Sequence, residues 1–539
     1  MGVKPRITGA ETRDLSTAAA RRWWAMAAIT FGILAVGLDA TVLSVALPTL
    51  ATSLHATESD LQWFASGYAL ALAAGMLPAG LLGDRYGRKK VMQIALALFG
   101  VGSIACAYAP SPAAFIAARV VLGAAGAGLV VMALSALTVL FSKSERPRAV
   151  GIWGAANFVA LPVGPILGGW LLTHFWWGWV FLMNVPVAML GLIAVSALVP
   201  ESRATERPRL DVLGVLTSSA GLVAWTYGLI EAGRNGWGDA SALLPLTLGM
   251  VAMAAFILWE RRLTRLPGGQ PLVDLTLFRS GSFTWGVILA AVAILPMFGV
   301  IFTMPQYFQG VLGMDAQGAG VRLVPVIIGL VLGAVPADRV AARVGMKITV
   351  ALGFGVMAAG MLLGATTRIG SSDGFVATWL AVVGIGMGLA VATAASAALV
   401  EIPKERSGVG SAMMQAFQKL GAPFGAAILG SALNSAYQSQ LQLALPAGVA
   451  DVVRESVFGG LAVAQRMHSV SLLRTVREAF VYGMDTALLV SAGIAAAGLL
   501  MALAFMPRRI AQLEEVTEQR LNPPLDLAEG SWRDGLTEI

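Results

Sequence analysis

Residues 80–90 read GLLGDRYGRKK, and residues 333–347 read GAVPADRVAARVGMK, a degenerate copy of the same pattern. A second pair of segments also repeats, GPILG at residues 164–168 and GAPFG at residues 421–425. The glycines that mark the two motifs are 77 residues apart in the first copy and 76 in the second. The sequence therefore predicts two halves of matching architecture.

The composition excludes a water-soluble protein. Of 539 residues, 57% are hydrophobic and 12% are charged, whereas about a quarter are charged in a typical globular domain. With a mean hydropathy of +0.76, too little polar surface remains to cover several soluble domains. Most of the chain must be solvated by lipid.

Fourteen apolar runs are each long enough to cross a bilayer as a helix. They are Trp24–Leu47, Leu61–Leu82, Val91–Ala109, Ala113–Phe141, Val150–Thr173, Trp179–Val199, Leu210–Ile230, Ala242–Trp259, Phe283–Pro305, Gly318–Val335, Ile348–Thr366, Phe375–Val400, Gly408–Ala436 and Val481–Phe505. A helix satisfies its own backbone hydrogen bonds in hydrocarbon. The alternating ten-residue segments typical of a membrane β-barrel do not appear.

The basic residues between these runs predict the orientation. The segments after even-numbered runs carry nineteen Lys and Arg, whereas the short segments after odd-numbered runs carry only Arg234 and Arg368. Cytoplasmic loops are the basic ones, so both termini are predicted to be cytoplasmic. The net charge of +7 thus reflects topology and does not indicate nucleic-acid binding. The first run is too long for the core of a signal peptide and is expected to be retained.

The repeat and the runs together predict the domain organisation. The expected parts are a cytoplasmic segment 1–23, a six-helix bundle 24–200, a linker 201–280 with transmembrane helices seven and eight, a second six-helix bundle 281–506 with an extracytoplasmic hairpin-like loop 437–480, and a cytoplasmic tail 507–539. Two parallel six-helix halves around a central cavity are a transporter architecture. The two linker helices have no counterpart in the repeat and are expected to be an insertion.

Four motifs carry a family resemblance. They are LDATVLSVALP at Leu38–Pro48, the loop Gly80–Lys90, RVVLGAAG at Arg119–Gly126, and GPILGG at Gly164–Gly169. The chain resembles the major facilitator superfamily, specifically its fourteen-span drug:proton antiporter branch of multidrug and quaternary-ammonium exporters. The resemblance implies an all-α integral membrane protein of the major facilitator fold, with two six-helix bundles plus two linker helices.

Two positions depart from the family pattern. Gly178 stands between Trp177 and Trp179 where relatives usually carry an arginine, so the role of that arginine cannot be transferred. Gln418 is followed by Lys419 where the family often has arginine followed by glutamine. The positive charge is thereby displaced by one position, about 100° around the helix.

Asp39 is an acidic residue well inside an apolar run, and a carboxylate there is functional by default. Burial favours its protonated form and a nearby cation its ionised form, which is what a proton carrier requires. Arg119 is expected to be its partner, because both residues lie at similar depths from the outer ends of their helices. The hypothesis is that proton, Arg119 and a cationic substrate compete for Asp39. The alternatives are a capping or packing role for Asp39 inside the bundle and a structural tether to backbone carbonyls for Arg119.

The two glycine-containing motifs are expected to serve conformational change. The predicted latch in the cytoplasmic turn consists of Gly80, Asp84, Arg85, Gly87, Arg88 and Lys89. Gly87 permits a tight reversal of the chain, and Asp84 can pair with the neighbouring arginines to stabilise one conformation. The basic residues of the turn also anchor the topology. The antiporter motif consists of Gly164, Pro165, Gly168 and Gly169. These residues favour close helix packing and a bend at the proline, either for packing alone or as a pivot.

A central substrate cavity is expected to be lined by glutamines, a soft or aromatic surface, and one lysine. The candidates are Trp63, Tyr68, Gln306, Gln309, Met414, Gln415, Phe417, Gln418 and Lys419. Plain packing is the alternative for the methionine and the aromatic residues. A coupling role and a paired structural role both remain open for Lys419.

No catalytic or metal site is predicted. Cys106 is the single cysteine, and His55, His174 and His468 are far apart in the sequence. No phosphate-binding Gly-Lys-Ser/Thr loop is present, so ATP is not expected to drive the protein. An enzyme or a receptor would need a polar cluster that the sequence lacks.

The predicted function is proton-coupled export of hydrophobic, cationic drugs or toxic compounds across a bacterial cytoplasmic membrane by alternating access. No cofactor is expected, because the proton gradient supplies the energy. The expected partners are protons, small lipophilic or cationic substrates and the lipid bilayer, and the protein is expected to be a monomer. The alternative is a dedicated exporter of one endogenous antibiotic or lipid-like metabolite.

Overall fold

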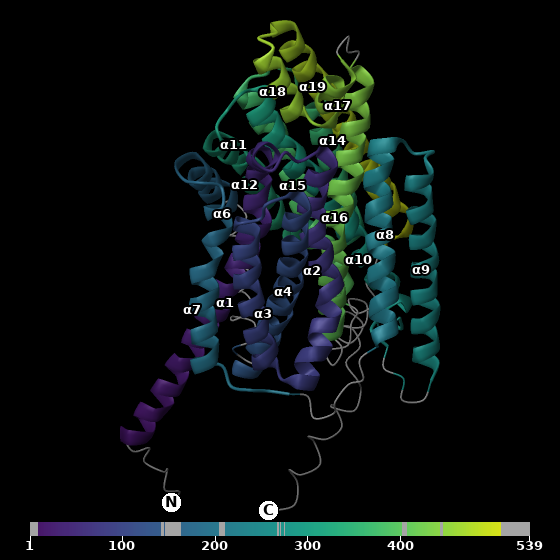
Figure 1. Cartoon of the computed structure of the whole chain (residues 1–539). Coiled ribbons are helices and arrows are strands. Elements are labelled where there is room, and N and C mark those ends of the chain that lie inside the picture. Colours follow the sequence, from purple (N-terminus) through teal and green to yellow (C-terminus); the bar gives the residue numbers. More distant parts are fainter. Residues whose placement is uncertain are drawn as a thin grey trace, which may run out of the picture.

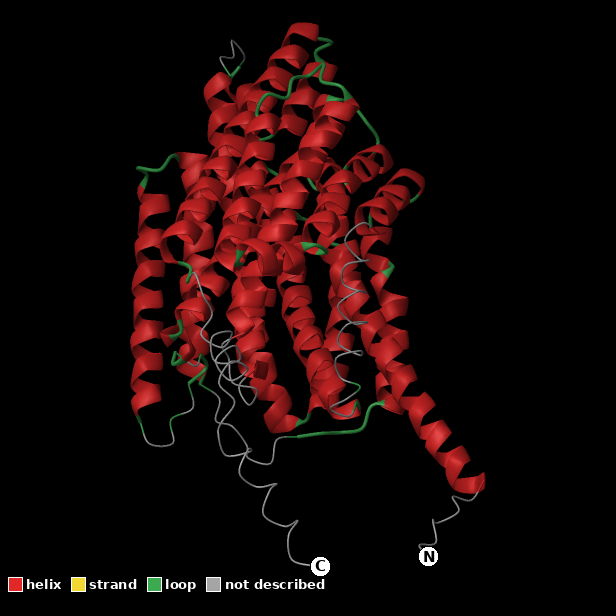
Figure 2. Cartoon of the chain, turned by 180° about the vertical axis from the view of Figure 1, so that it is seen from behind, coloured by secondary structure: helices red, strands yellow, loops and turns green. Residues whose placement is uncertain are grey.

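The computed structural model describes residues 9–141, 145, 163–203, 211–266, 269, 271–273, 275–400, 407–441 and 446–507. All regular structure within these ranges is helical, as the views from both sides show (Figures 1 and 2). The helices of the first half and the linker are α1 (Gly9–Ser53), α2 (Glu58–Tyr86), α3 (Arg88–Ala107), α4 (Pro112–Leu140), residues 163–174, α6 (Trp179–Leu182), α7 (Asn184–Leu198), α8 (Val212–Asn235) and α9 (Ala240–Arg265). Those that follow are η1 (Leu277–Arg279), α10 (Gly281–Gln306), η2 (Tyr307–Val311), α11 (Ala316–Arg322), α12 (Val324–Ala334), α13 (Ala337–Val344), α14 (Met346–Gly364), α15 (Asp373–Val400), α16 (Ser407–Gln440), α17 (Ala447–Glu455), α18 (Val457–Arg466) and α19 (Val470–Phe505).

Eleven helical segments in the described chain are long and apolar enough to cross a membrane, or twelve when the bent α2 is included. The α2 bend is 47° and falls between Met76 and Pro78, where proline removes a backbone donor. Two predicted runs lie outside this set. The fifth is described only from residue 163, and the thirteenth lies on α16. The count of fourteen therefore stays a prediction.

The helices pack as two groups that meet at the centre. In the first group, α2 packs on α3 and α4, and α1 packs on α7. In the second, α15 packs on α10, α12 and α14, and α19 packs on α14 and α16. The groups contact each other mainly through α2 and α16, which lie side by side in Figure 1.

The repeated loop motif folds in the same way in both halves. Gly87 ends α2 with φ +116°, and Gly345 ends α13 with φ +86°. Each amide donates to the carbonyl four residues back, that of Gly83 or of Ala341. Positive φ is readily adopted only by glycine, which explains why the repeat keeps glycine at this position.

The glycines of the second motif bring helices into close contact. A Cβ atom at Gly164 would collide with Thr41 of α1, and one at Gly168 with Val42. The equivalent glycines in α16 face α10, because a Cβ at Gly421 would meet Ala291 and one at Gly425 would meet Leu295. Gly169 instead faces Ala316 of α11, and Pro165 is buried in the same segment. This close approach supports the packing role of the motif, and the pivot stays a prediction.

The linker helices form a hairpin at the side of the molecule. The α8 helix packs along α9 and also contacts both α2 and α16, whereas α9 lies outermost (Figure 1). At one end of the molecule, α17 and α18 pack on each other, and α18 also packs on α19. These two short helices belong to the predicted loop 437–480.

Candidate functional site

A buried ion pair joins α1 to α4. The Arg119 Nη1 atom lies 2.5 Å from Asp39 Oδ2, and each side chain is 1% exposed. Asp39 comes from the middle of α1. Arg119 lies two turns into α4, which Ser111 caps through the amide of Ala114 and which Pro112 begins. An ion pair in the interior is stable only when its remaining polar atoms are also hydrogen-bonded.

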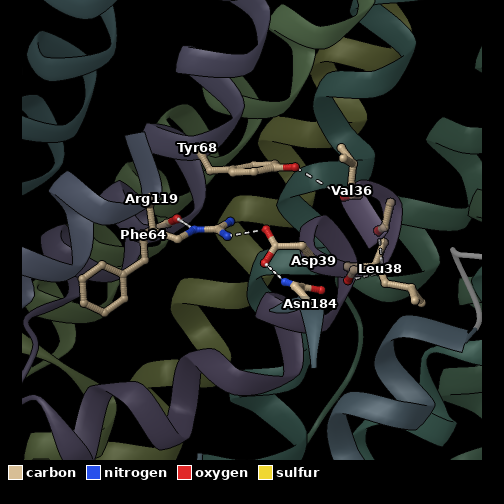
Figure 3. A network of polar contacts seen from close by, with 9 residues as sticks. Val36, Leu38, Asp39, Phe64, Tyr68, Arg119 and Asn184 are labelled. Carbon is tan, nitrogen blue, oxygen red and sulfur yellow. Dashed lines mark hydrogen bonds and ion pairs between the residues drawn. The ribbon is translucent and has the colours of Figure 1, made fainter. Parts of the chain in front are cut away.

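Neighbouring helices supply those hydrogen bonds (Figure 3). The Asn184 side chain, at the first turn of α7, donates to Asp39 Oδ1 over 3.1 Å. Arg119 Nε donates to the carbonyl oxygen of Phe64 over 3.3 Å. The guanidinium carbon lies 4.2 Å from the ring centroid of Tyr68, whose hydroxyl donates to Val36. The carboxylate is therefore held by a cation on one oxygen and an amide on the other.

A cavity between the two helix groups adjoins this network. Its described lining comes from five helices, α1, α2, α4, α10 and α16, and is mostly alanine, leucine and phenylalanine. Tyr68, Phe298 and Phe302 give it an aromatic surface. Arg119 lines the cavity, but Asp39 does not. A compound in the cavity would therefore contact the guanidinium before it could reach the carboxylate.

Lys419 is the second charged residue of the described lining. Its side chain is exposed to the cavity, and no hydrogen bond or ion pair joins it to another described residue. No carboxylate belongs to the lining within the described chain. Because both charges at the cavity surface are positive, this state offers no counter-charge to a cation. The expectation of a cationic substrate is not supported by this arrangement.

Two of the nine predicted cavity residues, Tyr68 and Lys419, line this cavity. Trp63 instead packs on Tyr227 of α8, with ring centroids 6.3 Å apart. Gln309 donates to the backbone oxygen of Val45 over 2.9 Å. Gln306 is buried at the end of α10, beside Glu58. The glutamines of this region thus connect the two helix groups and do not contact the cavity.

The candidates before Lys419 on α16 also lie away from the cavity. Met414 packs in a separate cluster with Phe256 and Leu277, and Phe417 packs against that cluster. Gln415 and Gln418 are half-buried and outside the described lining. Gln415, Gln418 and Lys419 all interrupt the apolar pattern of this helix, so the sequence could not show which of them meets the cavity.

The described hydrogen bonds of the predicted latch residues stay within the first half and the start of the linker. Arg88 forms an ion pair with Asp84 over 2.9 Å, and the Lys89 ammonium donates to the Ser196 carbonyl over 2.7 Å. The Arg88 amide donates to Ser202, just after α7. Gly80 packs on Val131 of α4, and the Arg85 guanidinium lies over the ring of Tyr86. These contacts fix the α2–α3 turn, while a latch between the halves stays a prediction.

The model of the Major Facilitator Superfamily matches residues 29–426. The chain belongs to this superfamily. The predicted family and all-helical membrane fold are therefore confirmed, and the chain is a multipass membrane protein of a transporter family. It is 30% identical to the tetracenomycin C resistance and export protein of Streptomyces glaucescens, over 90% of this chain and 91% of that protein. It is also 30% identical to the multidrug efflux pump LfrA of Mycolicibacterium smegmatis, over 90% and 96%.

Solved structures of transporters share the fold at low sequence identity. A bacterial homolog of the lysosomal transporter Spinster, in an inward-facing and unoccupied conformation, aligns with a TM-score of 0.66 and 14% identity, covering 91% of this chain and 98% of that one. A D-xylose–proton symporter aligns with a TM-score of 0.56 and 16% identity, covering 90% and 98%.

Sequence reasoning missed two buried polar residues, Asn184 and Glu58. Asn184 lies inside an apolar run, and an amide in such a run is itself a signal of an internal hydrogen bond. Glu58 lies before the predicted start of the second run, in a stretch that reads as a loop. The available signal was the capping box of Thr57 and Asp60, in which each side chain bonds the other's backbone amide. This box places Glu58 in the first turn of α2.

Proposed function

We propose that this chain exports hydrophobic compounds across a bacterial cytoplasmic membrane in exchange for protons, by alternating access to the central cavity. The single observation that carries the proposal is the buried Asp39–Arg119 pair beside that cavity. The relatives of this chain support export, since their names describe resistance, export or multidrug efflux. Both termini are proposed to be cytoplasmic, from the distribution of basic residues.

The ion pair can couple protons to cargo because Arg119 contacts both Asp39 and the cavity. While Asp39 is ionised, it holds Arg119 against α1 and the cavity can accept an apolar compound. A proton on Asp39 removes this attraction and frees the guanidinium, which already lines the cavity. A freed charge in an apolar cavity disfavours hydrophobic and cationic cargo. Proton and cargo therefore exclude each other, which is the requirement for antiport.

The proposal predicts a strict dependence of transport on a proton gradient. Purified protein in liposomes is supplied with the cation ethidium or the neutral dye N-phenyl-1-naphthylamine, and a pH gradient is imposed. We expect dye movement against its gradient only while the proton gradient persists, and immediate collapse when a protonophore is added. If the dye only equilibrates, and does so at the same rate with and without the pH gradient, proton antiport is contradicted. Such a result would indicate facilitated diffusion of the dye.

Replacing Lys419 by Met should favour cationic cargo. The lysine charge faces the cavity without a described partner, so it repels a cation bound there. Removing one such repulsion is worth about 1 kcal/mol, or about fivefold in affinity. We expect the KM for ethidium export to fall about fivefold, with little change for the neutral dye. Lys419→Arg is the matched control and should behave as wild type. A loss of export of both dyes would instead assign Lys419 to coupling.

A dedicated exporter of one antibiotic or lipid-like metabolite is the second candidate. It is favoured by relatives with single-compound names, the tetracenomycin C export protein and a probable actinorhodin transporter of Streptomyces coelicolor, which is 30% identical over 84% of this chain and 80% of that protein. The two candidates differ in breadth. Resistance of an expressing host to several unrelated drugs would argue against a dedicated exporter.

A further inference from the structure

The outer half of α2 faces the second half of the chain through a stripe of buried polar residues. Glu58, Gln62 and Ser66 are four residues apart and are 2%, 1% and 0% exposed. The Ser66 hydroxyl donates to the carbonyl oxygen of Pro423 in α16 over 3.3 Å, and Gln62 packs against Gly430 of the same helix. The two halves are therefore in contact along this stripe, at the end predicted to be extracytoplasmic.

Glu58 ends this stripe and contacts α10. Its Oε1 atom accepts a hydrogen bond from Gln306 Nε2 over 3.4 Å, and Gln306 is completely buried. No described Lys, Arg or His forms an ion pair with Glu58. A carboxylate in the interior without a cation is costly. The arrangement in which the outer ends of the two halves are in contact therefore fits a neutral, protonated Glu58.

The surrounding titratable groups do not supply the missing positive charge. From α16, the Tyr437 hydroxyl is within electrostatic range of Glu58 but donates to the carbonyl of Val453. On α2 itself, Asp60 is acidic and is engaged in the capping box. In the preceding turn, His55 is exposed to solvent. From α10, the group that reaches Glu58 is the Gln306 amide.

Two amide oxygens in this interface lack hydrogen-bond donors. Gln62 Oε1 and Gln306 Oε1 are buried without a partner among the described residues. A protonated carboxyl group has an O–H donor, whereas a carboxylate only accepts. Protonation of Glu58 would thus supply a donor where the interface has surplus acceptors. Opening the halves would let water solvate the same groups.

We propose that Glu58 is a second proton-binding site, which must be protonated for the outer end of the protein to close. This inference rests on the proposed alternating access and adds a second site to the Asp39–Arg119 pair. Closure captures a proton from the outside, and reopening returns it to the same side. Glu58 therefore sets the pH dependence of the outer gate without changing the number of protons exchanged per cargo. An acidic exterior favours closure, and an alkaline exterior favours opening.

The experiment measures the distance across the outer gate at different pH values. Spin labels are attached at Ser53→Cys in α1 and Gln465→Cys in α18, both exposed, in a Cys106→Ala background of the full chain. We expect the ratio of open to closed populations to rise by up to about tenfold per pH unit between pH 5 and 9, because one group titrates. Glu58→Gln, which is neutral and nearly isosteric, should hold the closed distance over the whole range. Asp451→Asn, on the exposed surface of α17, should keep the wild-type pH response.

The outcomes separate this inference from the proposed function. An unchanged pH response in Glu58→Gln, or a closed population that grows with pH, overturns the inference whatever the transport result. If Glu58→Gln does not fold, Glu58→Asp replaces it and should retain a one-proton response. Asp39→Asn should keep the wild-type distance response, so loss of proton-driven transport in that variant tests the first site and not Glu58.

Discussion

Asp39→Asn is expected to abolish proton-driven export while the protein still reaches the membrane. Asparagine keeps the shape of the side chain and can still hydrogen-bond Asn184, but it cannot bind or release a proton. Arg119 then remains free of its partner throughout the cycle, and the cavity that it lines stays charged. In liposomes, export with an imposed pH gradient should fall to the rate measured without one.

The matched control is Asp485→Asn. Asp485 is a half-buried carboxylate of α19 that forms an ion pair with Arg368 over 2.8 Å and does not belong to the cavity lining. Asp485→Asn removes one negative charge, as Asp39→Asn does, but away from the proposed coupling site. Export driven by the pH gradient should therefore persist in this variant. If Asp39→Asn retains full gradient-driven export, the proton is carried elsewhere and the proposed coupling is wrong.

Arg119→Met is expected to destabilise the folded protein strongly, and a second substitution should rescue it. The methionine leaves the Asp39 carboxylate in the interior without a cation, and breaking a buried pair in this way costs about 3–5 kcal/mol. The double variant Arg119→Met, Asp39→Asn has no unpaired charge, and replacing a buried pair by neutral groups is often nearly neutral. Thermal unfolding in detergent should therefore rank wild type and the double variant above Arg119→Met.

A matched exposed pair tests whether burial is the cause. Arg322 Nη2 lies 2.5 Å from Asp373 Oδ2, the same separation, but these side chains are 32% and 60% exposed. Arg322→Met should cost no more than about 1 kcal/mol, because water screens an exposed pair. Equal losses for Arg119→Met and Arg322→Met, or no rescue in the double variant, would contradict the account of the buried pair.

The fold could be predicted from the sequence because lipid imposes a strong constraint. Each run is predominantly apolar and must satisfy its own backbone hydrogen bonds in hydrocarbon, so it forms a helix. The ends of the helices were less predictable. The Trp179–Val199 run is divided into α6 and α7, and α2 begins at Glu58, before the predicted run. A hydropathy pattern indicates how long the apolar part of a helix is. It does not detect the capping residues and helix breaks that decide where a helix begins and ends.

The candidate site was predicted only in part. Asp39 and Arg119 could be paired because charges in hydrocarbon need partners and the two residues lie at similar depth. Asn184 and Glu58 were missed, since an uncharged amide and a helix-terminal glutamate carry weaker signals. Of the predicted cavity residues, Tyr68 and Lys419 line the cavity, whereas Met414 packs in a separate cluster.

The sequence by itself determined the helical membrane architecture, the repeat and the buried acid that needs a cation, because each follows from the cost of polar groups in hydrocarbon. The tertiary structure decided which residues face the cavity and which face another helix. Helices that are apolar on all sides carry no pattern that distinguishes those faces. Only their packing brings Lys419 to the cavity surface and Glu58 to the interface between the two halves.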